Sequence, residues 1–266
     1  MVLESWTSGD AYEAYVGRWS RVVARDFLAW LGIARGRRWL DVGCGTGALS
    51  EAVVAGHEPA HLYSLDRAFP YAQFARRRLS SPGVSCVVAD AQAVPLAPRS
   101  VDVVVSGLML NFVPQPALAV AEMARVLADG GVAAVYVWDY AGGMQFMRYF
   151  WDAAVALDAA AESVDEGRRF SICQPDALEA LFRAAGFGDV ETRAVDVPTR
   201  FENFDDYWTP FLGAQGSAPG YVSRLDEAGR VALRERLRAS LPTAADGSIP
   251  MIARAWAVKG AAAPRS

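Results

Sequence analysis

The chain has 266 residues, of which 53% are apolar and 21% charged, and its formal net charge is −4. This balance is typical of a soluble globular protein and argues against a nucleic-acid partner, which needs clustered positive charge. No stretch approaches the roughly 18 apolar residues that a membrane-spanning helix requires. The cysteines, Cys44, Cys86 and Cys173, lie far apart without metal-ligand spacing. We therefore expect neither a disulfide framework nor a metal site.

The first residues read MVLESWTSGD, which is acidic and polar where a signal peptide needs a basic start and an apolar run. With the cysteine pattern, this predicts a cytoplasmic protein. Next, residues 10–35 carry apolar and aromatic side chains at helical spacing and predict one or two amphipathic helices.

Strands and helices then alternate. The strand signals are RWL (38–40), HLYSLD (61–66), VSCVVAD (84–90), VDVVVSG (101–107) and VAAVYVWDY (132–140), and the clearest helical segments between them are ALSEAVVAG (48–56) and ALAVAEMARVL (117–127). VDVVVSG is a continuous apolar run of the kind that is buried in a parallel sheet. Strands that alternate with helices predict right-handed crossovers and a parallel sheet with both faces covered.

The second half of the chain is less regular. Residues 144–161 have a helical pattern rich in methionine and aromatic side chains, and a further helix begins near Pro175 and ends at Gly186. The segments DVETRAVDV (189–197) and SIPMIARAWAVKG (248–260) alternate between apolar and polar residues. We expect them to pair as antiparallel strands at the edge of the sheet.

A glycine loop, Asp41–Gly47, lies where the first strand turns into a helix. Glycines allow a tight turn and let a ligand approach the backbone, and the following helix start favours a polar or negative group. Gly43, Gly45 and Ala48 also satisfy the dinucleotide pattern, so a nicotinamide-dependent oxidoreductase is an alternative. Asp41 favours a different ligand, because a carboxylate there would repel a pyrophosphate but suits a cationic amino group and sulfonium.

Asp66 ends the second strand. A carboxylate at this position can accept hydrogen bonds from both hydroxyls of a ribose. Both ligand classes contain a ribose, so Asp66 predicts a nucleoside without choosing between them.

Four motifs in order resemble the class I S-adenosylmethionine-dependent methyltransferases, and especially the ubiquinone/menaquinone-biosynthesis C-methyltransferases. They are LDVGCGTG (40–47), Asp66 with its following helix, VVADAQAVPLAPRSVDVVVS (87–106) and ALAVAEMARVLADGG (117–131). The resemblance implies S-adenosyl-L-methionine as cofactor. It implies a doubly wound, Rossmann-like α/β fold whose mainly parallel seven-stranded sheet has an antiparallel final strand and helical caps. We expect one methyltransferase domain over 1–266, with its cofactor-binding core at about 37–140 and caps at about 1–35, 141–174 and 198–248.

The same resemblance assigns roles to residues of this chain. The three loop glycines would line the methionine portion of the cofactor, Asp66 would bind the ribose, and Ser106 would lie beside the methyl group. Asp90, Ala91 and Gln92 would bind at the adenine edge. The full set of candidate cofactor residues is Tyr15, Trp19, Asp41, Gly43, Cys44, Gly45, Gly47, Asp66, Arg67, Tyr71, Asp90, Ala91, Gln92 and Ser106.

The chain departs from the family at two places. Relatives often have methionine where Tyr71 stands, and many carry histidines after the fourth strand, where this chain has Leu108–Asn111. A histidine base is therefore not expected, and the catalytic residue stays unassigned. Asp139 and Tyr140, at the end of the fifth strand, are the candidates to orient or deprotonate a substrate.

The sequence predicts methyl transfer to a small, largely apolar or aromatic molecule, without a nucleic-acid or membrane partner and with the oligomeric state left open. The caps are rich in aromatic residues at helical spacing, and their place in the topology predicts a lid over the acceptor. The candidate pocket residues are Leu110, Asn111, Phe146, Phe150 and Trp208. The alternatives are the oxidoreductase and a non-catalytic S-adenosylmethionine-binding protein.

Overall fold

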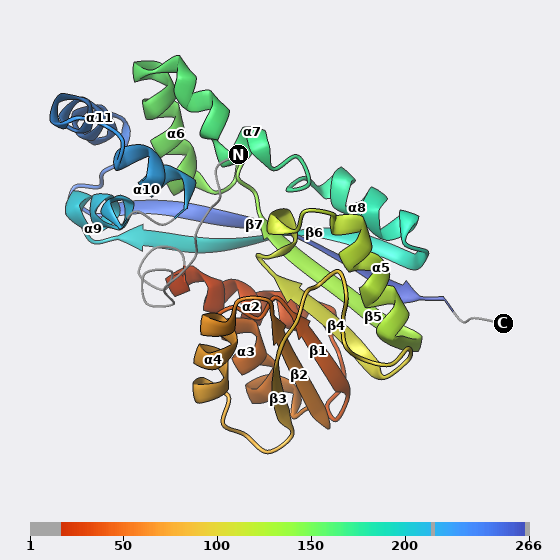
Figure 1. The fold of residues 1–266 in the computed structure, drawn as a ribbon. Coiled ribbons are helices and arrows are strands. Elements are labelled where there is room, and N and C mark those ends of the chain that lie inside the picture. The colour runs from red at the N-terminus through yellow and green to blue at the C-terminus, as the bar shows by residue number, and fades with distance from the viewer. Residues whose placement is uncertain (1–16, 214–215, 264–266) are drawn as a thin grey trace. The chain divides into compact units, whose positions relative to one another are not determined.

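The computed structural model describes residues 17–213 and 216–263 (Figure 1). In chain order the elements of the first half are α2 (Arg18–Leu31), β1 (Arg38–Val42), α3 (Ala48–His57), β2 (His61–Asp66), α4 (Phe69–Arg78), β3 (Val84–Val88), β4 (Val101–Gly107), the 3-10 helix η2 (Leu110–Phe112), α5 (Pro116–Val126) and β5 (Leu127–Trp138). The second half contains α6 (Gln145–Leu157), η3 (Ala159–Val164), α7 (Glu166–Arg169), α8 (Pro175–Ala184), β6 (Phe187–Phe201), α9 (Phe204–Trp208), η4 (Thr209–Leu212), α10 (Ser217–Val222), α11 (Glu227–Ser240) and β7 (Ile249–Ala262).

The strands form one seven-stranded sheet in the order β3-β2-β1-β4-β5-β7-β6. β1 lies between β2 and β4 and is parallel to both, so that Asp41 pairs with Ser64 on one side and with Val105 on the other. β3 and β5 extend the parallel part, and β7 and β6 complete the sheet with antiparallel pairing. The predicted fold class is confirmed, including the antiparallel final strand.

Burial along the strands follows from their positions in the sheet. β4 is buried almost continuously, as its unbroken apolar run predicts for a central parallel strand. β6 alternates between buried and exposed residues from Val195 to Phe201, as expected of an edge strand. An edge strand also tolerates Pro198, because a proline there removes no hydrogen bond from a central ladder.

The chain divides into two compact units of different character. Of the described residues, the first unit contains 17–19, 138–173, 196–213 and 216–255, and the second contains 20–137, 174–195 and 256–263. The second unit holds the parallel strands and the helices that connect them. The prediction of a single domain over the whole chain stays a prediction.

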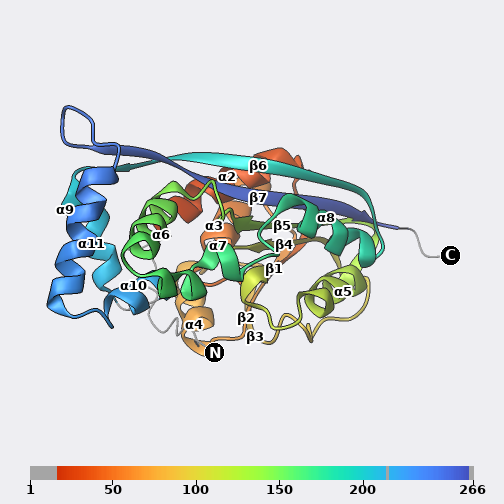
Figure 2. The ribbon, with the colours of Figure 1, turned by 90° about the horizontal axis from the view of Figure 1, so that it is seen from above.

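The first unit has a core of aromatic side chains. Phe150 stacks on Phe211 with ring centroids 4.5 Å apart and contacts Trp151 edge-on at 5.0 Å. Tyr207 packs edge-on against Phe201, and its hydroxyl donates to the carbonyl of Phe146 at 2.8 Å. Figure 2 shows α10 and α11 beside α6, which carries Phe150 and Trp151. Within the described ranges, no helix has both the length and the apolarity needed to cross a membrane.

Candidate cofactor site

The glycine loop leaves β1 in a conformation that favours glycine. Gly43, Gly45 and Gly47 have φ angles of 74°, 53° and 89°, in the left-handed region where a side chain is strained. The N–H groups of Gly43 and Cys44 both donate to the carbonyl of Leu65, at 2.7 and 2.9 Å. The loop is therefore fixed to the carboxyl end of β2, and α3 begins directly after Gly47.

Asp66 joins the glycine loop to the next helix. Its Oδ2 accepts from the N–H of Gly45 at 2.9 Å, and its Oδ1 accepts from the N–H of Ala68 at 2.8 Å. The side chain is 8% exposed, and burial raises the pKa of Asp66 above its ordinary value. Each carboxylate oxygen has a second lone pair. The carboxylate can thus hold the loop and still accept from a ligand hydroxyl.

Asp41 lies beneath α3 and is completely buried. Its Oδ2 accepts from the hydroxyl of Ser50 at 2.7 Å, and that hydroxyl lies 2.7 Å from the hydroxyl of Ser64. Its Oδ1 has no hydrogen-bond partner among the described residues. Burial, opposed in part by Ser50, raises the pKa of Asp41 to about 7. A buried acceptor without a partner fits a nearby cationic group, as the sequence predicts for this position.

The candidate adenine residues form a short turn after β3. Asp90 is exposed, and its Oδ1 accepts from the N–H and the side-chain amide of Gln92 at 2.8 and 3.2 Å. Ala91 is buried, and the N–H of Ala89 donates to the carbonyl of Asp66. The turn is therefore tied to the end of β2, beside the ribose candidate. Its contact with adenine stays a prediction.

Other cofactor candidates have different surroundings. Cys44 packs against Ala75 and Leu79, and burial raises the pKa of its thiol well above the usual range, which makes a nucleophilic thiolate unfavourable. Arg67 is exposed, and Tyr71 is half-buried. Their proposed contacts with the cofactor stay predictions.

The segment from the end of β4 to η2 contains two buried polar atoms without described partners. They are Oγ of Ser106, which is fully buried, and Nδ2 of Asn111. Leu110 beside them is also fully buried. Orphaned polar atoms of this kind call for a partner such as a ligand or an ordered water. Ser106 thus keeps its candidate role, and Leu110 belongs to the core in this conformation.

Trp19 belongs to the aromatic core of the first unit. It is 5% exposed, and its ring lies 5.0 Å from that of Phe146 and 5.3 Å from that of Phe201. Tyr15, the other candidate from the N-terminal segment, lies outside the described residues.

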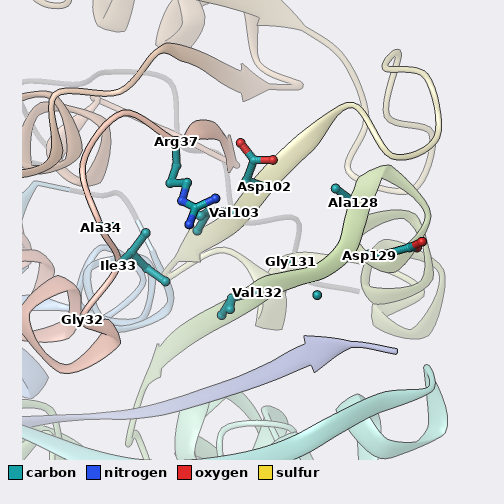
Figure 3. Close-up of a pocket in the computed structure, with 11 residues that line it drawn as sticks. Gly32, Ile33, Ala34, Arg37, Asp102, Val103, Ala128, Asp129, Gly131 and Val132 are labelled. Carbon is teal, nitrogen blue, oxygen red and sulfur yellow. The ribbon is translucent and has the colours of Figure 1, made fainter. Parts of the chain in front are cut away.

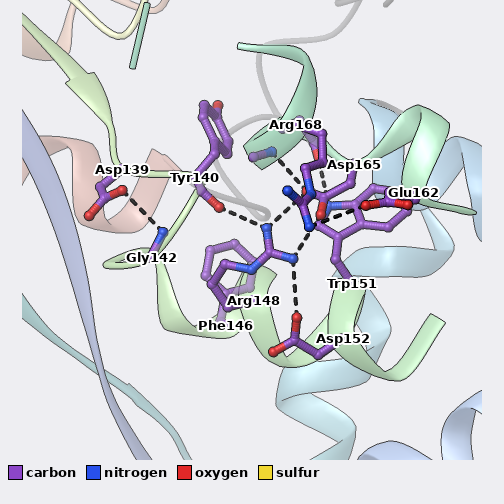
Figure 4. Close-up of polar contacts among 12 residues, drawn as sticks. Asp139, Tyr140, Gly142, Phe146, Arg148, Trp151, Asp152, Glu162, Asp165 and Arg168 are labelled. Carbon is purple, nitrogen blue, oxygen red and sulfur yellow. Dashed lines mark hydrogen bonds and ion pairs between the residues drawn. The ribbon is translucent and has the colours of Figure 1, made fainter. Parts of the chain in front are cut away.

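The candidate catalytic residues lie in a turn after β5 (Figure 4). Asp139 is 5% exposed, and its two oxygens accept from the N–H groups of Gly142 and Gly143 at 3.1 and 2.8 Å. Both oxygens thus stabilise the turn. Tyr140 is half-buried against Phe170, with ring centroids 5.6 Å apart. A catalytic role for either residue stays a prediction.

An ion-pair network that the sequence does not reveal holds this turn against α6 and α7. Arg148 donates to both oxygens of Asp165 at 2.9 and 2.8 Å and to the carbonyl of Tyr140 at 3.0 Å (Figure 4). Nearby, the indole N–H of Trp151 donates to the buried carboxylate of Glu166. Nothing in the spacing of Arg148 and Asp165 distinguishes them from surface charges, because their pairing depends on tertiary packing.

The candidate pocket residues Phe146, Phe150 and Trp208 are 1%, 0% and 6% exposed. They pack against other aromatic side chains and form part of the core of the first unit in this structure. Contact with an acceptor stays a prediction for all three.

A cavity of about 360 Å³ lies at the amino ends of the parallel strands, opposite to the ends that carry the glycine loop (Figure 3). It is lined by residues at the amino ends of β1, β4 and β5, including Arg37, Asp102 and Asp129. Asp102 is paired with Arg38 through two short contacts of 2.6 and 3.1 Å. In parallel strands the amino ends lie at the edge remote from the glycine loop, so this cavity is separate from the candidate cofactor site.

Fold and glycine loop together define a Rossmann-like α/β protein. Comparison with known proteins narrows this class: residues 40–135 match the family described as a methyltransferase domain. The malonyl-[acyl-carrier protein] O-methyltransferase of Geobacter sulfurreducens is 33% identical over 187 residues, which cover 68% of this chain and 67% of the relative. The chain therefore belongs to the S-adenosylmethionine-dependent methyltransferase family.

Other comparisons agree with this assignment. The demethylmenaquinone methyltransferase of Renibacterium salmoninarum is 36% identical over 115 residues, 43% of this chain and 45% of the relative. Two further curated relatives are matched over only 34% and 44% of their own length. The phosphoethanolamine N-methyltransferase 2 of Haemonchus contortus, solved with S-adenosyl-L-methionine, has the same fold, with a TM-score of 0.60, 16% identity and coverage of 97% of this chain and 58% of that chain.

Proposed function

We propose that this protein transfers the methyl group of S-adenosylmethionine to a small, largely apolar or aromatic molecule. The observation that carries the proposal is the bond between the loop expected to line the methionine portion and the carboxylate expected to bind the ribose. Gly45, in a loop of three left-handed glycines, donates its N–H to Asp66 at 2.9 Å. Membership of the methyltransferase family supports it.

The residues present fit the cofactor. A Cβ on Gly45 would meet nothing within 4 Å, so this glycine faces open space in which a ligand could lie. Asp66 has lone pairs for the ribose hydroxyls, and the unpaired Oδ1 of Asp41 suits the amino group. The cofactor supplies the electrophilic methyl group. The protein holds the cofactor and aligns the acceptor, and alignment of this kind is worth roughly 7–11 kcal/mol in favourable systems.

A histidine base is not part of the proposal. The Nδ1 of His57 lies 3.0 Å from the carbonyl of Ile33, and the Nε2 of His61 lies 3.1 Å from the hydroxyl of Ser85. Both histidines lie toward the amino edge of the sheet, because one ends α3 and the other begins β2. This chain is better suited to a methyl acceptor that is already anionic, or to one that is deprotonated by Asp139 or Tyr140.

Two alternatives have different experimental signatures. An oxidoreductase would bind NADH, and a non-catalytic binding protein would bind S-adenosylhomocysteine without turnover. Family membership favours the methyltransferase over the oxidoreductase.

Calorimetric titration with S-adenosylhomocysteine and with NADH tests the cofactor, and we expect binding of the first only. A metabolite extract incubated with methyl-labelled S-adenosylmethionine then tests turnover, and we expect label in a small, organic-extractable product. Binding of NADH instead would refute the proposal. Label only in protein or nucleic acid would refute the proposed acceptor.

We further propose that the enzyme works in the cytoplasm. Cys44, Cys86 and Cys173 are all free thiols, which favours a reducing compartment. Cell fractionation with an antibody against the protein tests this, and recovery from an oxidising compartment would refute it.

A further inference from the structure

Met109 lies directly on the glycine loop. A Cβ built on Gly43 would overlap Cγ of Met109 and would lie 2.7 Å from its Cβ. The space that a side chain at position 43 would need is thus filled by Met109. A Cβ built on Gly45, two residues later, would instead meet no atom within 4 Å. The two glycines therefore serve different purposes: Gly43 accommodates Met109, and Gly45 leaves room for a ligand.

The backbone holds Met109 in this place from both sides. Leu108 has a φ of 59°, in the left-handed region, and its N–H donates to the carbonyl of Tyr136 at 2.8 Å. After Met109, the N–H of Phe112 donates back to the Met109 carbonyl at 2.9 Å, and Leu110 is fully buried. A leucine in the left-handed region is strained, and such strain is concentrated at functional sites.

The contact connects the carboxyl ends of two neighbouring strands. Gly43 follows β1, Met109 follows β4, and these strands are parallel, with Asp41 opposite Val105. Met109 itself is half-buried. A methionine is unbranched and fills irregular gaps, so its side chain can follow the surface of a glycine turn.

We propose that Met109 is a positioning residue for the cofactor, which acts by packing on Gly43 and holding the glycine loop in its binding conformation. Loss of this packing lets the Gly43–Gly45 turn open and weakens the bond from the Gly45 N–H to Asp66. Cofactor affinity falls as a result. The inference rests on the proposed function, because it concerns the same cofactor.

Three variants test it. Met109→Ala removes the packing, and Met109→Leu keeps apolar volume on Gly43. Met123→Ala is the control for loss of methionine volume without loss of the Gly43 contact, because Met123 is fully buried on α5 and the atoms nearest to a Cβ on Gly43 all belong to Met109. Dissociation constants for S-adenosylhomocysteine are measured by calorimetry well below the melting temperature. Exchange of the Gly45 amide hydrogen is measured without ligand.

Met109→Ala should raise the dissociation constant at least about tenfold and speed exchange of the Gly45 amide by a similar factor. Met109→Leu should stay within about threefold of wild type in both measurements. Met123→Ala should lower the melting temperature and change neither.

Wild-type affinity in Met109→Ala would overturn the inference, as would equal losses in Met109→Leu or in Met123→Ala. If the unmodified protein does not bind S-adenosylhomocysteine, the proposed function fails. Amide exchange still decides whether Met109 holds the loop.

Discussion

The backbone N–H of Gly45 donates to Oδ2 of Asp66 at 2.9 Å, across the carboxyl ends of β1 and β2. This bond brings together two motifs that are 21 residues apart in the sequence. We therefore expect a ligand that binds the Asp66 carboxylate to lie beside the glycine loop, and a substitution at either Gly45 or Asp66 to weaken its binding.

Asp66→Ala should weaken binding of S-adenosylhomocysteine by more than tenfold. The substitution removes hydrogen bonds to the ribose, worth about 1.5–3 kcal/mol each when the acceptor is charged, and releases the Gly45 N–H. Asp66→Asn keeps one acceptor oxygen and should lose less. Calorimetry provides the measurement. Asp102→Asn, at the amino edge of the sheet, is the control and should bind normally; equal affinity of Asp66→Ala and wild type would remove Asp66 from the site.

Gly45→Ala should reduce cofactor affinity by more than its effect on stability explains. Gly45 and Gly32 have similar φ angles, 53° and 62°, and a Cβ at either would meet nothing within 4 Å. Alanine at either position thus carries the same left-handed strain, about 1–2 kcal/mol. Gly32 lies after α2, at the cavity on the amino edge of the sheet. Gly32→Ala should therefore lower stability without changing the affinity for the cofactor.

Thermal unfolding and calorimetric titration of both glycine variants decide the question. Gly45→Val, which is larger, should abolish binding while leaving a folded protein by circular dichroism. A Gly45→Ala protein that loses no more affinity than Gly32→Ala would show that the open space beside Gly45 is not the cofactor site.

Periodicity and turn signals are sufficient to predict most of this fold. β1, the glycine loop and α3 follow from apolar runs punctuated by glycine, and β4 from its unbroken valines. The ends of strands are predicted less accurately: β5 begins at Leu127, whereas the expected strand begins at Val132. β6 and β7 also extend beyond their expected ends. Main-chain pairing with a neighbour extends a strand through residues that have low strand propensity.

Side-chain roles are harder to predict than strands. A carboxylate at a strand end predicts a site, but the sequence does not show which donors will reach it. Asp139 accepts from Gly142 and Gly143, whereas Asp66 accepts from a loop 21 residues away. No motif marks Met109, because its proposed role depends on the missing Cβ of Gly43. Only the folded backbone brings that pair together.

Stability should depend on pH through Asp41. Its pKa is raised from 3.8 to about 7 by burial, so folding favours the protonated form. Between about pH 4 and pH 7 the unfolded chain loses this proton while the folded chain keeps it. The contribution of protonated Asp41 to the free energy of unfolding is thus fully present below pH 4 and is lost as the pH rises to 7.

Asp41→Asn removes this titration and keeps an acceptor for Ser50. The difference in unfolding free energy, variant minus wild type, should therefore increase from pH 4 to pH 7, by up to roughly 4 kcal/mol. Denaturant unfolding at several pH values measures it. Carboxylates that do not interact with Asp41 titrate alike in both proteins and cancel in the difference, whereas Asp66 raises the pKa of Asp41 and is coupled to it. A difference that is constant with pH would mean that Asp41 is ionised throughout.

Substitutions of the aromatic residues in the first unit can distinguish core residues from residues that contact the acceptor. Phe150 belongs to the core, because it is 0% exposed and its ring is stacked on that of Phe211 with centroids 4.5 Å apart. Phe150→Ala should cost about 3–5 kcal/mol and lower the melting temperature by roughly 10 °C. Val231→Ala, at a half-exposed position on α11, should leave the melting temperature almost unchanged.

Trp208 is the better candidate for contact with the acceptor, because it keeps 6% exposure and is stacked on Phe204 with centroids 6.5 Å apart. Once an acceptor is known, Trp208→Ala should raise its KM severalfold while the affinity for S-adenosylhomocysteine stays at the wild-type value. Phe146→Ala and Phe150→Ala should act mainly on the melting temperature. Steady-state kinetics and thermal unfolding of the three variants separate the two effects. If all three only lose stability, and the acceptor KM of each matches wild type, these residues form a structural core and the acceptor binds elsewhere.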